Sequence, residues 1–333
     1  MKPLKRSRIT DAGIEASSRL NSARSILIAS HVKPDGDALG ASAAISGAAS
    51  SRGKKATMLL HEPLSERLEK LVPPVDSRIS PGDFVEEAGK VDLLMIVDTC
   101  NLSQLGAIAE DLPRFREKTV VIDHHQTVEE IGSVRWIDTT AAAVGVMMLE
   151  LFEYLNWNLD DHVAESLATA ILTDTGWLRF SNTDTRCLEA VSRLVDSGVK
   201  MDDLFKRIYQ TDRIEKLRLL AGALGGMQLH CNGRLAVMTI TREDFKRTGA
   251  GADETENIVN EAMRIGEVEV AVIFMETGET IRVSLRSRKD IDVAEIAASL
   301  GGGGHTRAAG FQHAGSLPEA RDVTIEAISG KLG

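Results

Sequence analysis

Four short, largely aliphatic runs in the first half of the chain constrain its fold more than any other feature of the sequence. The runs are Ser25–Ser30, Ala56–Leu60, Val91–Val97 and Thr119–Ile122. Because they do not alternate with polar residues, each predicts a strand that is buried on both faces, as in a parallel sheet between helical layers. Residues 37–49 are mostly small, which predicts a helix that packs closely on the sheet. The first half is therefore predicted to be α/β, built from strand–helix units.

The pattern changes in the second half of the chain. Residues 141–209 are predicted to be mostly helical, with a break at residues 173–176, and residues 213–227 to form a connecting helix. After the turn signal Asn232-Gly233, the pattern predicts a smaller α+β unit. Its predicted strands are 235–240, 268–274 and 280–285, and its predicted helices are 254–264, 293–299 and 318–329. The 333 residues suit about two domains. We predict an N-terminal domain over residues 1–200, a helical connector over 201–230 and a C-terminal domain over 231–333.

Charge and cysteine content narrow the class of function. Asp and Glu number 49 against 39 Lys and Arg, which gives a formal net charge of −10. An acidic chain is poorly suited to binding long duplex nucleic acid, but it can hold a small anionic substrate at a locally positive site. Three cysteines far apart argue against a disulfide framework or a thiolate zinc site, and suit a reducing cytoplasm. Since no apolar stretch has the length of a signal-peptide core or a membrane span, no membrane partner is expected.

Acidic and imidazole side chains directly follow three of the predicted strands. The groups are His31, Asp35 and Asp37 after the first strand, Asp98 after the third, and Asp123-His124-His125 after the fourth, with Asp174 at the helix break. Ligands of parallel sheets bind at the carboxyl ends of the strands. Carboxylates crowded there without a cation would repel one another and take up protons. Oxygen and nitrogen donors without sulfur favour Mn²⁺, with Mg²⁺, Co²⁺ or Fe²⁺ as alternatives, so the sequence predicts a divalent metal centre.

The number of candidate ligands favours two ions over one. The candidates are His31, Asp35, Asp37, Asp98, His124 and Asp174. Two ions ~3.5–4 Å apart that share a carboxylate would use them all, and such a pair best supports hydrolysis of a phosphate ester. Asp123 has a second interpretation, in which it orients a histidine instead of binding metal. The histidines at positions 61, 162, 230 and 313 are assigned to the surface or to satisfied positions.

Four consecutive glycines, Gly301–Gly304, precede His305 in the predicted C-terminal domain. One interpretation is a flexible loop. The other is a set of backbone amides that binds a phosphate at the start of a short helix, aided by the helix dipole. Arg286 and His305 are candidates to contact the same phosphate, within a basic patch formed by Arg286, Arg288, Lys289 and Arg307.

Aromatic residues limit the length of any nucleic-acid substrate. They make up only 4% of the chain, so a long series of base-stacking side chains is not expected. Trp177 and Phe180, beside Asp174, are assigned to the core rather than to base contacts. The predicted substrate is therefore one to a few nucleotides long.

The ordered set of motifs resembles the DHH phosphoesterase superfamily over nearly the whole chain. The motifs are His31-x-x-x-Asp35-x-Asp37, Asp98, Asp123-His124-His125, Asp174-Thr175-Gly176 and Gly301-Gly302-Gly303-Gly304-His305. The last of them is similar to the motif of the branch that carries a DHH-associated C-terminal domain. Within that branch the chain looks most like the bifunctional oligoribonuclease and 3′-phosphoadenosine-5′-phosphate phosphatases, the nanoRNases.

The resemblance implies a two-domain enzyme with its active site in the cleft between the domains. One Mn²⁺ would be held by His31, Asp35 and Asp98, and a second by Asp37, Asp98, His124 and Asp174, so that Asp98 bridges the two ions. His125 would lie near the scissile phosphate as an electrophile or proton donor, with Asp98 and Asp123 in the same catalytic group. The far phosphate or terminal nucleotide would be held by Arg286, Ser287, Gly302, Gly303, Gly304 and His305. The implied products are nucleoside 5′-monophosphates from short single-stranded RNA, and the 3′-phosphate released from 3′-phosphoadenosine 5′-phosphate.

Several alternatives stay open at this stage. A cyclic-dinucleotide or linear dinucleotide phosphodiesterase of the same branch would use the same motifs, and a homodimer is compatible with the sequence. The glycine run disfavours a family II-type inorganic pyrophosphatase, and the intact ligand set disfavours a non-catalytic nucleotide-binding protein. One departure from the family is visible, because many relatives carry an arginine several residues after Asp98 where this chain has Asn101-Leu102-Ser103-Gln104. A basic substrate contact from this loop is therefore not expected.

Overall fold

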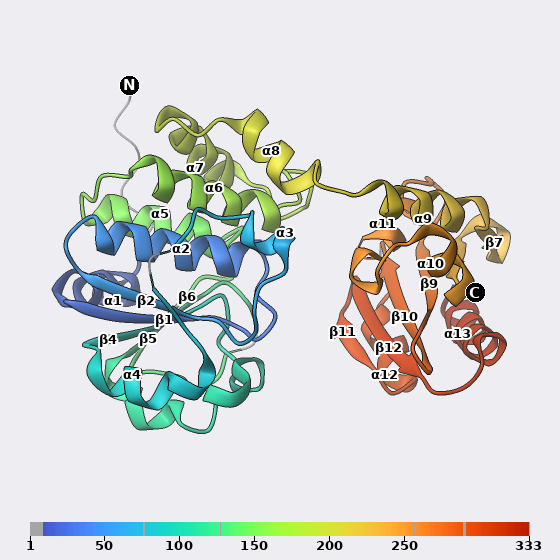
Figure 1. Ribbon diagram of the computed structural model, residues 1–333, viewed down its shortest axis with the longest axis horizontal. Coiled ribbons are helices and arrows are strands. Elements are labelled where there is room, and N and C mark those ends of the chain that lie inside the picture. The colour runs from blue at the N-terminus through green and yellow to red at the C-terminus, as the bar shows by residue number, and fades with distance from the viewer. Residues whose placement is uncertain (1–8, 76, 127, 256, 289–290, 333) are drawn as a thin grey trace. The chain divides into compact units, whose positions relative to one another are not determined.

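The computed structural model describes residues 9–332 except for positions 76, 127, 256, 289 and 290. The chain divides into two compact units, Met1–Thr211 and Asp212–Gly333, each with its own six-stranded sheet (Figure 1). Its three cysteines are free thiols. Among the described residues, no helix combines the length and the apolar character needed to cross a bilayer.

The sheet of the first unit is parallel throughout, in the order β3-β2-β1-β4-β5-β6. Its four central strands are the aliphatic runs of the sequence: β2 (Lys55–Leu59), β1 (Ser25–Ala29), β4 (Leu93–Val97) and β5 (Thr119–Asp123). The sequence pattern does not predict the two edge strands, β3 (Arg78–Ile79) and β6 (Val134–Ile137), because they are short and each carries an arginine. The predicted α/β class with a parallel N-terminal sheet is confirmed.

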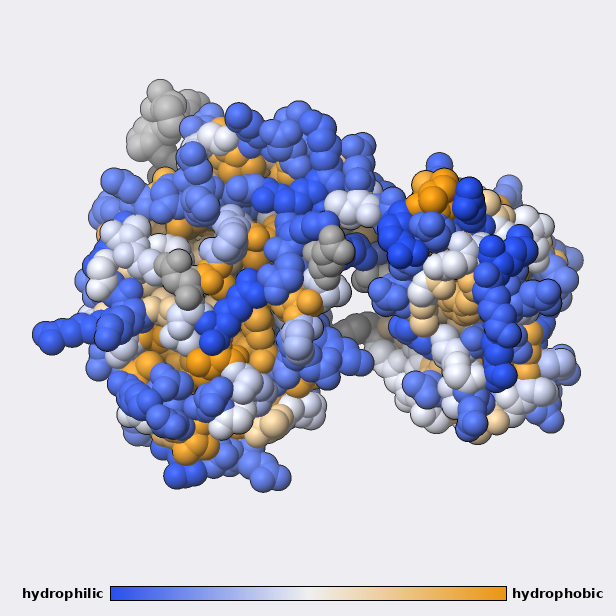
Figure 2. Space-filling model, in the orientation of Figure 1, coloured by the Kyte–Doolittle hydropathy of each residue, from blue (hydrophilic) through white to orange (hydrophobic). Residues whose placement is uncertain are grey.

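Each face of this sheet has its own apolar core. Ile26 and Ile28 of β1 lie in one core, and Leu27 and Ala29 lie in the other, as the two-residue period of a strand requires. The first core packs against α1 (Asp11–Ser22), α2 (Gly36–Ser50), α5 (Val144–Tyr154), α6 (Asp161–Asp174), α7 (Thr185–Asp196) and α8 (Met201–Tyr209). The second packs against α4 (Phe84–Lys90) and the 3₁₀ segments Leu102–Ile108 and Leu112–Lys118, on the opposite side of the sheet (Figure 1). The short α3 (Glu66–Glu69) and a 3₁₀ turn at Pro81–Asp83 complete the unit. Its visible surface is largely hydrophilic, with hydrophobic residues showing between the charged ones (Figure 2).

Two glycines let α2 approach α6 at the edge where β1 ends. A Cβ on Gly36 would lie 2.3 Å from Thr173 Oγ1, and a Cβ on Gly40 would lie 2.5 Å from the Ser166 carbonyl oxygen. Contacts this short exclude any larger residue without movement of α6. The close approach brings the start of α2 next to the end of α6, where Asp174 is the last helical residue.

The second unit contains a mixed sheet in the order β11-β12-β10-β9-β8-β7. Only β8 (Leu235–Ile240) and β9 (Val270–Thr277) run parallel; the other neighbours, β7 (Gln228–His230), β10 (Thr280–Ser287), β11 (Gly303–His305) and β12 (Ala308–His313), pair antiparallel. One face packs on α12 (Val293–Ser299) and α13 (Leu317–Leu332), and the other on α9 (Ile214–Gly225), α10 (Arg242–Thr248) and α11 (Ile258–Ala262). The separate, smaller C-terminal unit is confirmed, and its predicted helix at 254–264 is shorter than expected.

Residues 201–230, the predicted connector, contain one helix of each unit. Leu204 and Ile208 of α8 are buried in the core of the first unit. Leu219 and Ala223 of α9 are buried in a core of the second.

The glycine run does not begin a helix, so that part of the prediction is wrong. Helix α12 ends at Ser299, and Gly303–His305 forms β11, which pairs with β12. Residues 308–313 are a strand because Ala309 and Phe311, two residues apart, both enter the core beside β10. The run therefore follows the C-terminal end of a helix, where the dipole is negative and does not attract phosphate.

Candidate metal centre and active site

The predicted ligands gather at one edge of the first unit's sheet, where β1, β4 and β5 end. These strands are direct neighbours, so the residues that follow them come together. Asp98 directly follows β4 in a left-handed conformation, with φ of 61°. Asp35 caps the start of α2, and Asp174 ends α6. The structure therefore brings together side chains from four separate segments of the sequence, residues 31–37, 98, 123–125 and 174.

The donor atoms form three overlapping groups. The groups are His31, Asp35 and Asp98; Asp37, His124 and Asp174; and Asp98, His124 and His125, with the atoms of each group within 4.8 Å of one another. Asp98 joins them, because its Oδ2 lies 3.5 Å from His31 Nε2 and its Oδ1 lies 3.6 Å from His124 Nε2. Nε2 of His124 also lies 3.7 Å from Asp174 Oδ2 and 3.9 Å from Asp37 Oδ2. All six predicted ligands are thus in one cluster, with Asp98 at its centre.

Hydrogen bonds from outside the cluster hold several of these side chains in place. Nδ1 of His124 lies 3.1 Å from the Ala141 carbonyl oxygen, which directs Nε2 into the cluster. Asp37 accepts hydrogen bonds from the first two amides of α5, Val144 N at 2.6 Å and Gly145 N at 2.9 Å. Such contacts fix ring and carboxylate orientation in metal sites.

The electrostatics of the cluster fit a bound cation. Asp98 is only 2% exposed, and among the described residues its Oδ1 has no hydrogen-bond partner. Burial, and then the neighbouring carboxylates, hold the pKa values of Asp37 and Asp98 well above their usual range. Burial likewise raises the pKa of Asp174. A divalent ion would relieve both the unpartnered oxygen of Asp98 and the repulsion among the buried carboxylates, because it binds that oxygen and offsets the negative charge.

Binding of Mn²⁺ should raise the melting temperature more at about pH 8 than at about pH 5.5. The folded protein holds the carboxyl protons more tightly than the unfolded chain, so metal-free stability is lost as pH rises through the raised pKa values. Ions bind the ionised carboxylates and displace these protons. We expect at least ~10-fold tighter binding at the higher pH, or ~1.4 kcal/mol of added stabilisation in excess metal. Thermal unfolding with Mn²⁺ or EDTA measures this, and equal gains at both pH values would contradict it.

His125 and Asp123 form a pair beside the cluster. His125 Nδ1 lies 2.8 Å from Asp123 Oδ1, and this bond is the first cause that raises the pKa of His125 to about 9. Asp123 is fully buried, and burial alone would raise its pKa. The hydrogen bonds from the His125 ring and from the His124 and His125 amides outweigh burial, so the pKa of Asp123 is lowered. The His125 side chain is 47% exposed. Asp123 thus contacts His125 and belongs to none of the three donor groups, which favours the interpretation that it orients a histidine.

Three residues support the site in ways that the sequence pattern did not reveal. Asn182 donates to the Asp174 carboxylate at 3.4 Å and to the Ala142 carbonyl oxygen at 3.0 Å. His61, assigned to the surface or to a satisfied position, is half-buried, and its Nε2 lies 3.3 Å from the carbonyl oxygen of Ser30, beside His31, which fits the second assignment. Gln104 accepts from Thr99 Oγ1 at 2.5 Å, and its own carbonyl oxygen accepts from Val32 N at 2.8 Å. Gln104 therefore links the loops that bear Asp98 and His31.

The predicted substrate-binding residues lie in the second unit, around one end of β10, β12 and β11. Arg286 pairs in register with Ala308, which also pairs with His305. Ser287 donates to the Ile291 carbonyl oxygen at 2.7 Å. A Cβ on Gly302 or Gly304 would meet backbone atoms of β12, whereas at Gly303 it would meet open space. The side chain of His305 and all of Lys289 lie outside the described part of the structure.

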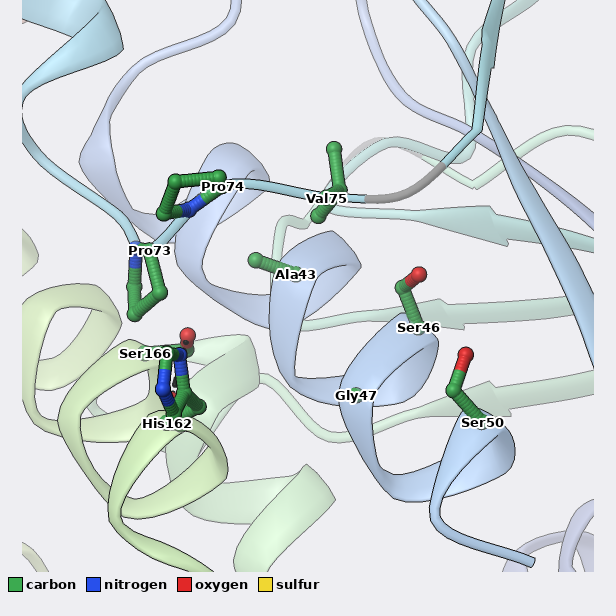
Figure 3. Close-up of a pocket in the computed structure, with 9 residues that line it drawn as sticks. All are labelled: Ala43, Ser46, Gly47, Ser50, Pro73, Pro74, Val75, His162 and Ser166. Carbon is green, nitrogen blue, oxygen red and sulfur yellow. Dashed lines mark hydrogen bonds between the residues drawn. The ribbon is translucent and has the colours of Figure 1, made fainter.

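A separate, small pocket of about 50 Å³ opens between α2, α6 and residues 73–75 (Figure 3). His162 and Ser166 of α6 line one side of it and Ser46 and Ser50 of α2 the other. None of the predicted site residues borders it, so we assign it no part in the chemistry.

Comparison with known proteins identifies both domains. Residues 25–173 match the DHH family N-terminal domain, and residues 232–330 match the DHHA1 domain. The chain is 31% identical over 310 residues to the bifunctional oligoribonuclease and PAP phosphatase NrnA of Thermus thermophilus, covering 92% of this chain and 90% of that protein.

Solved structures show the same fold. An exopolyphosphatase-related protein from Bacteroides fragilis superposes with a TM-score of 0.92 at 23% identity over 98% of each chain. RecJ of Thermus thermophilus, solved in complex with Mn²⁺, matches with a TM-score of 0.59 at 13% identity, covering 99% of this chain and 56% of that one.

The chain belongs to the DHH family and carries the family's DHHA1 domain. It is a hydrolase of phosphate esters, similar to the NrnA-type enzymes, with a cluster of acidic and histidine side chains that could hold metal at the carboxyl edge of its parallel sheet.

Proposed function

We propose that this enzyme hydrolyses short single-stranded oligoribonucleotides to nucleoside 5′-monophosphates and removes the 3′-phosphate of 3′-phosphoadenosine 5′-phosphate. The position of Asp98 carries the proposal, since its two oxygens face His31 and His124 on different sides of the cluster. A carboxylate so placed suits a two-ion phosphoesterase. The name and the similarity of the Thermus relative support this substrate class. With three free cysteines, the cytoplasm is the compartment we propose.

We propose two divalent ions, with Mn²⁺ as the preferred metal and Mg²⁺ or Co²⁺ as alternatives. His31, Asp35 and Asp98 would hold one ion, and Asp37, Asp98, His124 and Asp174 the other. When bound, such ions acidify a water molecule and neutralise charge on the phosphoryl group.

The side chain of His125 would act on the leaving oxygen. Its Nδ1 is held by Asp123, which leaves Nε2 to carry a proton toward the substrate. Because the bond to Asp123 raises the pKa of His125 to about 9, the ring is protonated at neutral pH in the metal-free protein. A protonated Nε2 can donate to the scissile phosphate and then to the departing oxygen.

The second unit would bind the end of the substrate away from the scissile bond. Arg286, Ser287 and the backbone of Gly302, Gly303 and Gly304 lie around one end of its sheet, with His305 next in the chain. The guanidinium of Arg286 suits a terminal phosphate, and the glycines would let the phosphate approach closely, although the Gly302 amide itself donates to the Ala297 carbonyl oxygen at 2.8 Å. A single such site would favour short substrates over long ones.

Arg286→Ala should raise the KM for a dinucleotide ~10–100-fold while Mn²⁺ binding stays normal, since a hydrogen bond to a charged group is worth ~1.5–3 kcal/mol. Arg282→Ala is the matched control, because Arg282 lies on the same strand and is exposed. Steady-state kinetics and metal titration measure both effects. An unchanged KM in Arg286→Ala would show that this end of the sheet does not hold the substrate.

A product assay tests the proposed function as a whole. The purified protein with Mn²⁺ is offered labelled dinucleotide, 3′-phosphoadenosine 5′-phosphate, a cyclic dinucleotide and pyrophosphate in parallel. Release of 5′-monophosphates from the first and phosphate from the second is expected. Exclusive turnover of the cyclic dinucleotide, or of pyrophosphate, would replace this proposal by one of the alternatives.

A further inference from the structure

The loop that follows Asp174 presents an exposed aromatic ring. Phe180 is 55% exposed, so its assignment to the core is wrong. Trp177, in contrast, packs against Phe205 and Tyr209, with ring centroids 5.1 and 5.8 Å apart. Phe180 is the most exposed of the large hydrophobic side chains among the described residues, in a chain with only 4% aromatic residues.

The backbone of this loop is held in a costly conformation. Gly176, Trp177 and Leu178 all have positive φ, at 54°, 60° and 64°. For the two residues other than glycine this costs ~1–3 kcal/mol each, and such strain concentrates at ligand sites. Hydrogen bonds to the Thr175 carbonyl oxygen from the amides of Arg179 and Phe180, both 3.0 Å, fix the turn. The ring of Phe180 is therefore carried on an ordered support.

One face of the ring rests on the backbone of Gly176. A Cβ built on Gly176 would lie 2.4 Å from Cζ of Phe180 and 2.6 Å from both Cε atoms. Nearly equal distances to these three atoms place that point over the ring face rather than beyond its edge. Since this face is covered, the 55% exposure of Phe180 is shared by the opposite face, the ring edges and the backbone, and the opposite face is the one on which a planar group would stack.

The loop that carries the ring is also tied to Asp174, one of the candidate metal ligands. Gly176 is two residues from Asp174, so their Cα atoms are at most ~7.6 Å apart. Asn182, two residues beyond Phe180, donates to the carboxylate and to the carbonyl oxygen of Asp174, at 3.4 and 3.2 Å. The loop is thus held next to Asp174 on both sides of Phe180, by the short chain to Gly176 before it and by the hydrogen bonds of Asn182 after it.

We propose that Phe180 is the stacking platform for a nucleobase next to the scissile phosphate. The inference rests on the proposed function and names how its substrates are recognised. Every base has a π-face, so one such platform binds short RNA without regard to sequence, with purines favoured by their larger area. Exposed Arg179, whose Nε is fixed to the Gly176 carbonyl oxygen at 2.8 Å, adds positive charge beside the ring. This charge suits the phosphodiester that accompanies the base.

Kinetics with base-free substrates test the platform. For a dinucleotide of two adenosines, Phe180→Ala should lower kcat/KM ~5–150-fold, which corresponds to the loss of one stacked base at ~1–3 kcal/mol. Phe180→Trp should retain the activity. Two further substrates lack either the first or the second base of this dinucleotide. With the one that lacks the stacked base, the wild type and Phe180→Ala should be equally slow, because there is no base for Phe180 to contact. Leu188→Ala, at a 50% exposed apolar residue of the same unit, is the control and should match the wild type.

Fluorescence of Phe180→Trp gives a second readout that does not depend on turnover. Adenosine 5′-monophosphate should quench the added indole, with the wild type as the blank, and ribose 5-phosphate should not. Quenching by neither compound, or normal kinetics of Phe180→Ala on all three dinucleotides, would overturn the platform. If the wild type hydrolyses no dinucleotide, the proposed function fails instead, and the fluorescence result still decides whether Phe180 stacks on a base.

Discussion

Asp98→Asn is expected to lower kcat for dinucleotide hydrolysis by at least ~10³-fold. Loss of a residue that only supports a metal ligand lowers metal affinity or activity ~10–100-fold, and loss of a carboxylate shared by two ions should cost more. The substitution keeps the shape of the side chain but removes the charge that faces both His31 and His124. Without metal the variant should be at least as stable as the wild type, because Asp98 is buried among other carboxylates that raise its pKa.

A matched control for this variant stands at the other end of the same strand. Asp92 immediately precedes β4 as Asp98 follows it, but Asp92 accepts hydrogen bonds from the exposed amides of Arg24 and Ser25 at 2.9 and 3.1 Å. Asp92→Asn should keep full activity. Kinetics on both variants, with thermal unfolding in EDTA, separate a lost ligand from a lost fold. Substantial turnover by Asp98→Asn would rule out a bridging role for Asp98.

The second large effect is expected at His125. His125→Gln should lower kcat ~10²–10⁴-fold, the usual contribution of a positioned acid or base. A proton donor acts only while protonated, so the wild-type rate should fall as pH rises through the pKa of His125, which is about 9 in the metal-free protein. The variant should lack this alkaline limb and still bind Mn²⁺.

Asp123→Asn tests the partner of this histidine. Loss of the carboxylate removes the main cause that raises the pKa of His125. The alkaline limb should therefore move to lower pH, while metal binding persists. Rate profiles between about pH 6 and 10 measure the shift. An unmoved limb would show that Asp123 does not set the protonation of His125.

The first unit was largely predictable because its signals are local. The runs of β1, β4 and β5 are continuous and aliphatic, and the ligands follow them directly, so strand adjacency alone assembles His31, Asp98 and His124. The short edge strand β6 gave no such signal, since Arg135 interrupts it. The same rule of parallel sheets that predicts the fold therefore predicts the site.

Residues whose roles depend on tertiary contacts escaped the sequence. The link of Asn182 to Asp174 and the contact of His61 with the Ser30 carbonyl oxygen follow from loop conformations that no periodicity encodes. Small residues around Gly304 suit either a helix start or a strand, and pairing of β12 with β10 decides between them. Exposure of Phe180 likewise depends on the left-handed turn at Trp177 and Leu178. At these positions the local residue types allow more than one conformation, and tertiary packing selects the one that forms.

Anomalous diffraction from crystals of the Mn²⁺-loaded protein, recorded at the manganese edge, shows whether two ions share Asp98. We expect two peaks, one among His31, Asp35 and Asp98, and the other among Asp37, Asp98, His124 and Asp174, with one oxygen of Asp98 nearest each. A single peak, or manganese bound without Asp98, would contradict the two-ion assignment.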